Sequence, residues 1–225
     1  MAGARRSTRT PEQPRVVTRP AGETLWRVSG DPIGLAFSTR ADRQNRFSPV
    51  LTPDGQAVAG AWYGATSPAG AIFESVFHDI RPSDADPRVQ PNQYLRRYLS
   101  PVVTTRDLLM VDLTTLGLQA IGITRTALIE SRPTRYAFTL GVAERLRRAA
   151  PEADGFAWVS RAHDSSQSLV VYADPGRPRM LDRDPSELAL ALGLGRGLAL
   201  LRELATEARI TVVLPSPERT EGPGR

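Results

Sequence analysis

The sequence predicts an α+β fold in a single domain, with a mixed or mainly antiparallel sheet and flanking helices. Predicted strands and helices follow one another without the regular strand–helix–strand order of a doubly wound parallel fold. The length of 225 residues suits one domain of moderate size. A hydrophobic content of 40% is enough to fill the core of such a domain.

The two ends of the chain differ from its middle. Residues 1–22 are rich in arginine, threonine and proline without a hydrophobic period, so we expect a disordered tail. A folded domain should span residues 23–214, and the polar end, 215–225, should be flexible. Five arginines and one glutamate in the first 20 residues account for +4 of the net charge of +5. The remainder is close to neutral, which argues against a basic nucleic-acid surface.

Short runs rich in β-branched and aromatic residues, bounded by glycine and proline, predict the strands. The first run, TLWRVS, carries Arg27 in its middle. The second, AVAGAWYGA, consists largely of small residues, which allow a backbone or a ligand to approach closely. The third reads as two segments or one bent strand, and the fourth and fifth as a hairpin. The expected strands span residues 24–29, 57–65, 102–113, 155–161, 168–174 and 209–214.

The clearest helix follows the second strand. Ser67 can cap its N-terminus, and Pro68 suits its first turn. Apolar side chains then recur with helical spacing as far as Ile80, and this stripe should face the core. Glu74 lies about 120° from the centre of the stripe, on the flank of the buried face. We therefore expect a carboxylate beside the core on one continuous helix.

Three further helices are predicted. Residues 92–99 should form a short helix and residues 133–150 an amphipathic one. The sequence DPSE at 184–187 is typical of a helix start, so the last helix should begin there and be interrupted at GLGRG, residues 193–197. Because GLGRG would then follow a helix rather than a strand, it does not match a dinucleotide-binding loop.

Composition excludes several classes of site. The chain has no cysteine, which excludes disulfides, zinc–thiolate sites and cysteine nucleophiles. Its two histidines argue against a metal cluster, so we expect no metal. All 29 basic residues are arginine, which excludes a lysine Schiff base. No apolar run is long enough for a membrane span or a secretory signal, and we expect a cytoplasmic protein.

Four polar side chains lie in largely apolar or small-residue surroundings. They are Arg27, Arg46, Glu74 and Ser160. Taken singly, each is better explained by ordinary structure than by function. A strand arginine usually extends its charge to solvent or pairs with a carboxylate, and a flank glutamate is usually solvated. A serine that ends a strand is usually a turn residue.

Taken in order, these positions resemble the RES family, which is named for its arginine, glutamate and serine. The most specific portion is DGFAWVSRAHDSSQSLVVYAD, residues 154–174, followed by WYGATSPAGAIFESVF, residues 62–77. The resemblance covers about residues 24–182. It implies a fold like that of the ADP-ribosyltransferases. One departure is QNRF, which stands where the family often has Gly-Gly-Arg-Trp.

The resemblance also implies a function. RES proteins are typically toxins of toxin–antitoxin pairs that deplete cellular NAD by cleaving its nicotinamide–ribose bond, by hydrolysis or with inorganic phosphate as acceptor. The implied catalytic residues are Arg46, Glu74 and Ser160. NAD would be the substrate, with no bound cofactor and with phosphate as an optional co-substrate. The implied partner is a helix-turn-helix antitoxin of the Xre type, and we expect nucleic-acid binding only through that antitoxin.

The chemistry of NAD suits these residue types. Guanidinium forks bind a diphosphate well, and Arg27 and Arg46 are the candidates. The cationic nicotinamide ring suits the aromatic face of Tyr63. Cleavage builds oxocarbenium character on the ribose, which the Glu74 carboxylate would stabilise. Ser160 would hydrogen-bond Glu74 or the ribose and fix its position.

Two other functions fit the sequence. The first is a transferase that moves ADP-ribose from NAD onto a macromolecule, which labelled NAD and an acceptor would reveal. The second is a non-catalytic nucleic-acid-binding module that uses the arginine-rich tail. It predicts salt-sensitive DNA binding that is lost when residues 1–20 are deleted. The sequence leaves hydrolysis and phosphorolysis equally open, and the product formed with and without phosphate would distinguish them.

Overall fold

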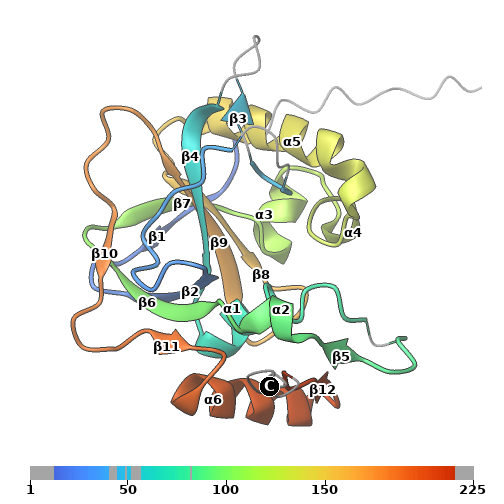
Figure 1. Cartoon of the computed structure of the whole chain (residues 1–225). Coiled ribbons are helices and arrows are strands. Elements are labelled where there is room, and N and C mark those ends of the chain that lie inside the picture. Colours follow the sequence, from blue (N-terminus) through green and yellow to red (C-terminus); the bar gives the residue numbers. More distant parts are fainter. Residues whose placement is uncertain (1–12, 41–44, 49, 52–56, 82, 216–225) are drawn as a thin grey trace, which may run out of the picture.

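The computed structural model describes residues 13–40, 45–48, 50–51, 57–81 and 83–215, and a ten-stranded mixed sheet forms its centre (Figure 1). The order along the sheet is β1-β7-β8-β9-β4-β2-β6-β10, with β3 paired to β4 and β11 to β6. The strands are β1 (Val16–Arg19), β2 (Thr24–Ser29), β3 (Val50–Leu51), β4 (Ala57–Ala65), β6 (Tyr98–Thr104), β7 (Leu108–Asp112), β8 (Gly155–Val159), β9 (Gln167–Ala173), β10 (Leu181–Arg183) and β11 (Leu190–Ala191). Strands β7 and β8 run parallel and their neighbours antiparallel, which confirms the predicted α+β class.

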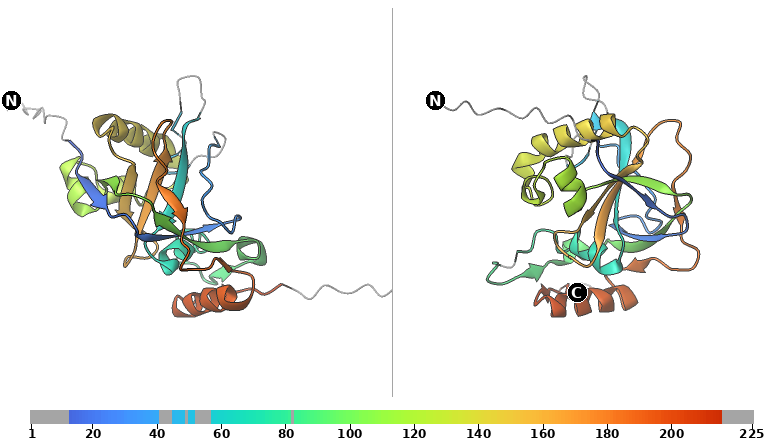
Figure 2. Two further views of the ribbon diagram at one scale, coloured as in Figure 1. Left: turned by 90° about the vertical axis from the view of Figure 1, so that its left-hand side faces the viewer. Right: turned by 180° about the vertical axis from the view of Figure 1, so that it is seen from behind.

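Short helices pack beside the sheet, and the two longest lie at opposite ends of the molecule in all three views (Figures 1 and 2). The helices are α1 (Pro68–Phe73), α2 (Pro91–Tyr94), α3 (Thr115–Ala120), α4 (Arg125–Leu128), η1 (Pro133–Arg135), α5 (Tyr136–Ala149) and α6 (Gly195–Glu207). Next to α6, β5 (Arg88–Val89) and β12 (Thr211–Val212) form a second, two-stranded sheet. In the described part of the chain, each helix is too short or too polar to cross a membrane.

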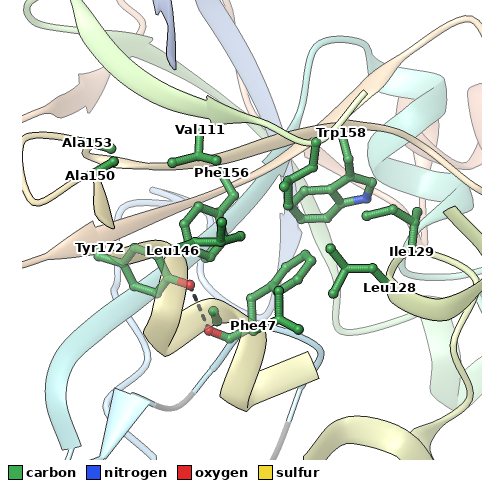
Figure 3. Close-up of a cluster of buried hydrophobic side chains, with 14 of the residues drawn as sticks. Phe47, Val111, Leu128, Ile129, Leu146, Ala150, Ala153, Phe156, Trp158 and Tyr172 are labelled. Atoms are coloured by element: carbon green, nitrogen blue, oxygen red, sulfur yellow. Dashed lines mark hydrogen bonds between the residues drawn. The ribbon is translucent and has the colours of Figure 1, made fainter. Parts of the chain in front are cut away.

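Three clusters of buried side chains fill the space around the sheet. The Phe47 core includes Phe47, Val111, Leu128, Leu146, Phe156, Trp158, Val170 and Tyr172 (Figure 3). The Ile72 core includes Ile72, Phe77, Tyr94, Leu99, Leu192 and Leu201. The Trp62 core includes Leu25, Trp62, Val102, Met110, Leu169 and Val171. Because successive strand residues point to opposite faces, the Trp62 core lies on one face of the sheet and the other two cores lie on the opposite face.

The prediction of a disordered tail over residues 1–22 is wrong for its second half. Strand β1 pairs antiparallel with β7 at one edge of the sheet. Beside it, Arg15 forms an ion pair with Asp112, and Arg19 forms one with Glu23. The rest of that tail and nearly all of the predicted C-terminal tail lie outside the described residues.

Two predicted helices are shorter than expected. Helix α1 begins after the Ser67 cap as predicted, but it ends at Phe73, and Glu74 is its C-cap. The apolar stripe nevertheless extends past the end of the helix. Phe77 lies in the turns that follow and is buried in the Ile72 core. Residues 92–99 are divided between α2 and the start of β6. Apolar spacing alone therefore overestimated helix length at both places.

The helix predicted to begin at residue 184 is also wrong. The Asp184 carboxylate accepts hydrogen bonds from the N–H and hydroxyl of Ser186 and from the hydroxyl of Thr24, which makes a turn rather than a helix start. Helix α6 begins within GLGRG, directly after β11. A Cβ at Gly197 would lie 2.1 Å from Ala191 O, so glycine allows the helix to pack on the strand. Because β11 pairs antiparallel with β6, this loop lacks the parallel unit of a dinucleotide fold.

Asp154 joins β8 to the neighbouring β7. Its carboxylate is 1% exposed and accepts from Arg106, from Arg177 and from the Leu109 N–H. Burial alone would raise the pKa of Asp154, but these hydrogen bonds and the positive charge of Arg106 hold it below its ordinary value. The aspartate that opens the DGFAWVSR motif is thus a structural residue.

We expect Asp154→Asn to lower the free energy of unfolding by about 3 kcal/mol, since it removes the shared partner of two guanidinium groups. Because the folded pKa of Asp154 is depressed, its contribution is present above the unfolded value near 3.9 and is lost as the pH falls through the folded value. Urea unfolding at pH 7 and at pH 3 checks this. A loss of stability that is equal at both pH values would contradict it.

Candidate active site

The Ser160 hydroxyl and the Glu74 carboxylate are hydrogen-bonded to each other. Ser160 Oγ donates to Glu74 Oε1 at 2.6 Å, and the backbone N–H of Arg161 donates to the same oxygen at 3.0 Å. An ionised carboxylate only accepts hydrogen bonds, so the single hydroxyl proton of Ser160 points to Glu74. The second oxygen, Glu74 Oε2, lies 3.9 Å from His78 Nδ1, beyond hydrogen-bonding distance. One oxygen is therefore fixed by the protein, and the other can accept from a ligand.

Ser160 directly follows β8 and is fully buried. Its N–H donates to Ser166 O at 3.0 Å, which closes the turn between β8 and β9. Its Oγ accepts from the N–H groups of Ala162 and His163 at 3.1 and 3.0 Å. Ser160 is thus a turn residue, as its position at a strand end predicts, and it still has a proton for Glu74.

Helix α1 brings Glu74 to this turn. At its N-terminus the Ser67 hydroxyl accepts from the Gly70 N–H at 3.0 Å, and Ile72 is fully buried beneath it. A Cβ at Gly70 would lie 2.0 Å from Ser166 Oγ, so glycine permits the close approach of helix and turn. Glu74 follows at the C-cap, where its side chain is 16% exposed. The carboxylate is therefore shielded from bulk solvent without being fully enclosed.

The backbone around Arg46 is held by side chains from two distant elements. Thr139 Oγ1 in α5 donates to Arg46 O at 2.6 Å, and Tyr172 Oη in β9 donates to Phe47 O at 2.7 Å (Figure 3). The Phe47 ring is fully buried and meets the Trp158 ring edge to face, with 5.1 Å between the ring centroids. The aromatic residue after the arginine is therefore an anchor.

Tyr63 completes the support of this segment. Its hydroxyl donates to Ser48 Oγ at 3.0 Å and accepts from the Phe47 N–H at 3.3 Å. Burial raises the pKa of Tyr63 to about 12, so the hydroxyl keeps its proton at neutral pH. The hydroxyl is therefore engaged within the protein, and the ring packs against the Phe47 core.

The Arg46 guanidinium is buried without a full set of partners. The residue is 6% exposed, and neither Nε nor Nη2 has a hydrogen-bond partner among the described residues. Burial lowers the pKa of Arg46, and the charge of Arg161 adds to this effect while that of Glu74 opposes it. An arginine remains protonated in proteins, so its unpartnered N–H groups carry a desolvation cost. An anionic ligand would remove that cost.

The structure does not bring Arg27 to this cluster, so its expected position in one site with Arg46 is wrong. On β2, Trp26 lies opposite Ala65, and both point to the face of the Ile72 core. The alternation of a strand then directs Arg27 to the other face. There its Nη1 donates to Ala36 O at 2.6 Å, and its guanidinium lies 5.7 Å from the centroid of the Trp62 ring.

Three residues beside the cluster were missed by sequence reasoning. His78 stands four positions after Glu74, and Arg161 directly follows Ser160, so their spacing was a usable signal for both. Arg125 in α4 donates to the last carbonyl of β8 at 3.2 Å and to Ser160 O at 3.1 Å, which fixes the end of the strand. No sequence signal links α4 to that strand end, because the contact depends on the tertiary fold.

A cleft of about 1130 Å³ opens beside the cluster. Typical small-molecule sites occupy roughly 300–1000 Å³, so the cleft is large enough for a nucleotide-sized ligand. His78, Tyr136 and Arg161 belong to its lining, whereas Glu74 and Ser160 do not. Arg46 and Tyr63 are not part of the lining either, so the cleft adjoins the cluster through Arg161, whose backbone N–H binds the Glu74 carboxylate. Among the described residues, no three histidine, aspartate or glutamate side chains gather in a way that could hold a metal ion.

Comparisons with known proteins give a family match and a solved structure of similar fold. A family model described as the RES domain matches residues 24–191, which is more than half of the chain. The crystal structure of the M. tuberculosis MbcT–MbcA toxin–antitoxin complex contains a chain of similar fold. The TM-score is 0.55 at 20% identity, and the match covers 84% of this chain and 92% of that one. A comparison with curated proteins gave no match.

Proposed function

Because the chain belongs to the RES domain family, we propose that it is a toxin that degrades NAD by cleaving the nicotinamide–ribose bond. The observation that carries this proposal is the Ser160–Glu74 hydrogen bond, formed beside a buried arginine with unpartnered N–H groups. The large cleft adjoins this group through Arg161, which lines the cleft and donates its backbone N–H to Glu74. The similar fold of a chain in a toxin–antitoxin complex supports the toxin role.

Glu74 has the chemistry that this reaction needs. As nicotinamide leaves, its bonding electrons return to the ring nitrogen, and positive charge develops on the ribose. Glu74 Oε1 is occupied by Ser160 and Arg161, so Oε2 is the oxygen that would accept from a ribose hydroxyl and stabilise that charge. Water or inorganic phosphate would then add to the ribose carbon and lose a proton. Nicotinamide departs as a neutral molecule, so a covalent intermediate is not required.

Arg46 and Tyr63 would bind the parts of NAD on either side of that bond. The free Nε and Nη2 of Arg46 suit a phosphate oxygen, either of the NAD diphosphate or of an inorganic phosphate acceptor. The Tyr63 ring would contact the nicotinamide, since its hydroxyl already binds Ser48 and Phe47. The Tyr63 hydroxyl binds the two residues that follow Arg46, so the Arg46 backbone and the Tyr63 ring are positioned relative to each other before the substrate binds.

Incubation of the purified protein with NAD tests the proposal. We expect release of nicotinamide together with ADP-ribose, or with ADP-ribose 1″-phosphate when inorganic phosphate is present. Labelled ADP-ribose that appears on a protein or nucleic acid instead would favour the transferase. If NAD stays intact under all these conditions, the proposal is wrong.

Two ion pairs near the start of the described chain weaken the nucleic-acid-binding alternative. Arg15 and Arg19, two of the five arginines in the predicted tail, form ion pairs with Asp112 and Glu23 in the folded domain. They are therefore not part of a free basic arm. We propose that the partner is an antitoxin protein of the Xre type and that DNA is contacted through that antitoxin. Copurification of the toxin with its antitoxin, followed by DNA binding with and without the antitoxin, checks this.

The Ser160→Ala variant tests whether the Ser160 hydroxyl positions Glu74 for catalysis. Loss of the hydroxyl frees Glu74 Oε1 from one bond and leaves the N–H groups of Ala162 and His163 without their acceptor. We expect kcat to fall about tenfold and the free energy of unfolding to fall by about 1–3 kcal/mol. Nicotinamide release and urea unfolding measure the two effects.

Ser168→Ala is the matched control for this variant. Ser168, on β9, is also a buried serine, but its Oγ has no hydrogen-bond partner among the described residues. Its removal should leave both kcat and stability unchanged or slightly improved. An equal loss of kcat in the two variants would show that Ser160 has no specific link to catalysis.

A further inference from the structure

Arg161 presents a second guanidinium between Glu74 and the cleft. Its Nη2 lies 3.3 Å from His78 Nε2 and 3.3 Å from His78 O, and the residue lines the cleft. In the described part of the chain, these guanidinium contacts are with a neutral side chain and a carbonyl rather than with a carboxylate. Its positive charge is therefore held in place without being neutralised.

The contact with Arg161 fixes the tautomer of His78. Arginine is always a donor, so His78 Nε2 must accept and the ring proton must be on Nδ1. That proton points toward Glu74 Oε2, 3.9 Å away, and Nδ1 has no hydrogen-bond partner. Burial, and after it the charge of Arg161, lowers the pKa of His78, which keeps the ring neutral near pH 7.

The charges around Glu74 do not balance. Arg46 and Arg161 are both close enough to influence each other and His78, whereas Glu74 is the shielded carboxylate beside them. Asp79 also faces His78, but it is exposed to solvent. One guanidinium charge is thus left over in a largely buried setting. A partly buried excess of positive charge favours an anion that enters from the cleft. Of the arginines that line the cleft, Arg161 is the one whose charge acts on Arg46, whereas Arg27 lies on the other face of the sheet.

We propose that Arg161 binds the diphosphate of the nucleotide substrate, and that His78 positions the Arg161 guanidinium for this contact. The inference rests on the proposed function, because it assigns a substrate group to the same site. It makes Arg161 the residue that selects a dinucleotide over a substrate without phosphate. His78 acts through Arg161 and is a positioning residue.

Comparison of two substrates tests the role of Arg161. In Arg161→Gln, we expect KM for NAD to rise about 10- to 100-fold with kcat within about threefold, because charge-assisted hydrogen bonds to the diphosphate are lost. Cleavage of nicotinamide riboside, which carries no phosphate, should change by less than about threefold. Arg202→Gln, an exposed change of the same charge on α6, should leave both substrates unaffected.

Two substitutions of His78 test the positioning. The side-chain oxygen of His78→Gln can replace Nε2 as an acceptor for Arg161, whereas His78→Leu cannot. We expect a near-normal KM for NAD in the first variant and a raised KM in the second. In the wild type, KM should rise as the pH falls and His78 becomes protonated, because Nε2 then no longer accepts. The groups that face His78 are Glu74, Asp79, Arg161 and Arg46, and His78→Gln should remove this pH dependence.

The outcomes separate this inference from the proposed function. If the wild type cleaves neither substrate, and calorimetry detects no binding of ADP-ribose to it, the proposed function itself fails. If the wild type cleaves NAD but Arg161→Gln has an unchanged KM, the role of Arg161 is wrong. If Arg161→Gln loses activity equally on NAD and nicotinamide riboside, Arg161 supports Glu74 rather than the diphosphate, which also overturns the inference.

Discussion

Glu74→Gln should reduce NAD cleavage about 10²- to 10³-fold and leave the protein folded, because it removes the charge that stabilises the transition state and keeps the shape of the side chain. The glutamine Oε1 can still accept from Ser160 Oγ and from the Arg161 N–H, which are the hydrogen bonds that fix the carboxylate in the wild type. The loss should therefore appear in kcat rather than in KM. Steady-state release of nicotinamide measures both parameters.

Glu144→Gln is the control for this change. Glu144 is exposed on α5, so its substitution alters the net charge by the same amount outside the site. Its kcat should equal that of the wild type. Circular dichroism and thermal unfolding should be nearly the same for all three proteins. A Glu74→Gln variant that is folded and retains full cleavage would remove Glu74 from the mechanism.

Arg46→Met should make the protein more stable and less active. The guanidinium is buried with two unpartnered nitrogen atoms, and a buried unsatisfied polar group costs about 1–3 kcal/mol. Methionine keeps an unbranched apolar stem and removes that cost, so the free energy of unfolding should rise by about this amount. Activity should fall about 10²-fold, because a preorganised donor to the substrate anion is lost.

Thermal unfolding with and without ligand separates the two effects of Arg46. In the wild type, ADP-ribose should raise the melting temperature, because an anion satisfies the free N–H groups. In Arg46→Met the melting temperature without ligand should be higher and the ligand effect smaller. Arg145→Met, at an exposed position on α5, should change neither. A less stable Arg46→Met protein would show that the guanidinium has partners in solution.

Strands were predicted more accurately than helices, for a physical reason. The period of a strand is short, so a few residues such as those of β2, β4 and β9 define it, and the glycines and prolines between strands mark the ends. Helix ends depend on local side-chain bonds. The Asp184 carboxylate bonds to Ser186 and to distant Thr24, and this turns a typical capping sequence into a turn. Tertiary contacts of that kind are not visible in the sequence.

The proximity of the candidate residues was predicted in part. Glu74 and Ser160 meet because one caps a helix and the other follows a strand whose patterns were readable, and Arg46 lies close enough to feel the Glu74 charge. Arg27 was misplaced because the face on which a strand residue lies depends on its register with the neighbouring strand. Register is set by pairing between distant segments. The support of Arg46 by Thr139 in α5 was equally inaccessible.

Cellular NAD after induced expression is the measurement that tests the central claim most directly. We expect NAD to fall sharply when the wild-type chain is induced without its antitoxin, and to stay at the uninduced level when Glu74→Gln is expressed to the same amount. Growth should stop only in the first case. Cells that stop growing while their NAD is unchanged, or that lose NAD equally with both chains, would contradict the account.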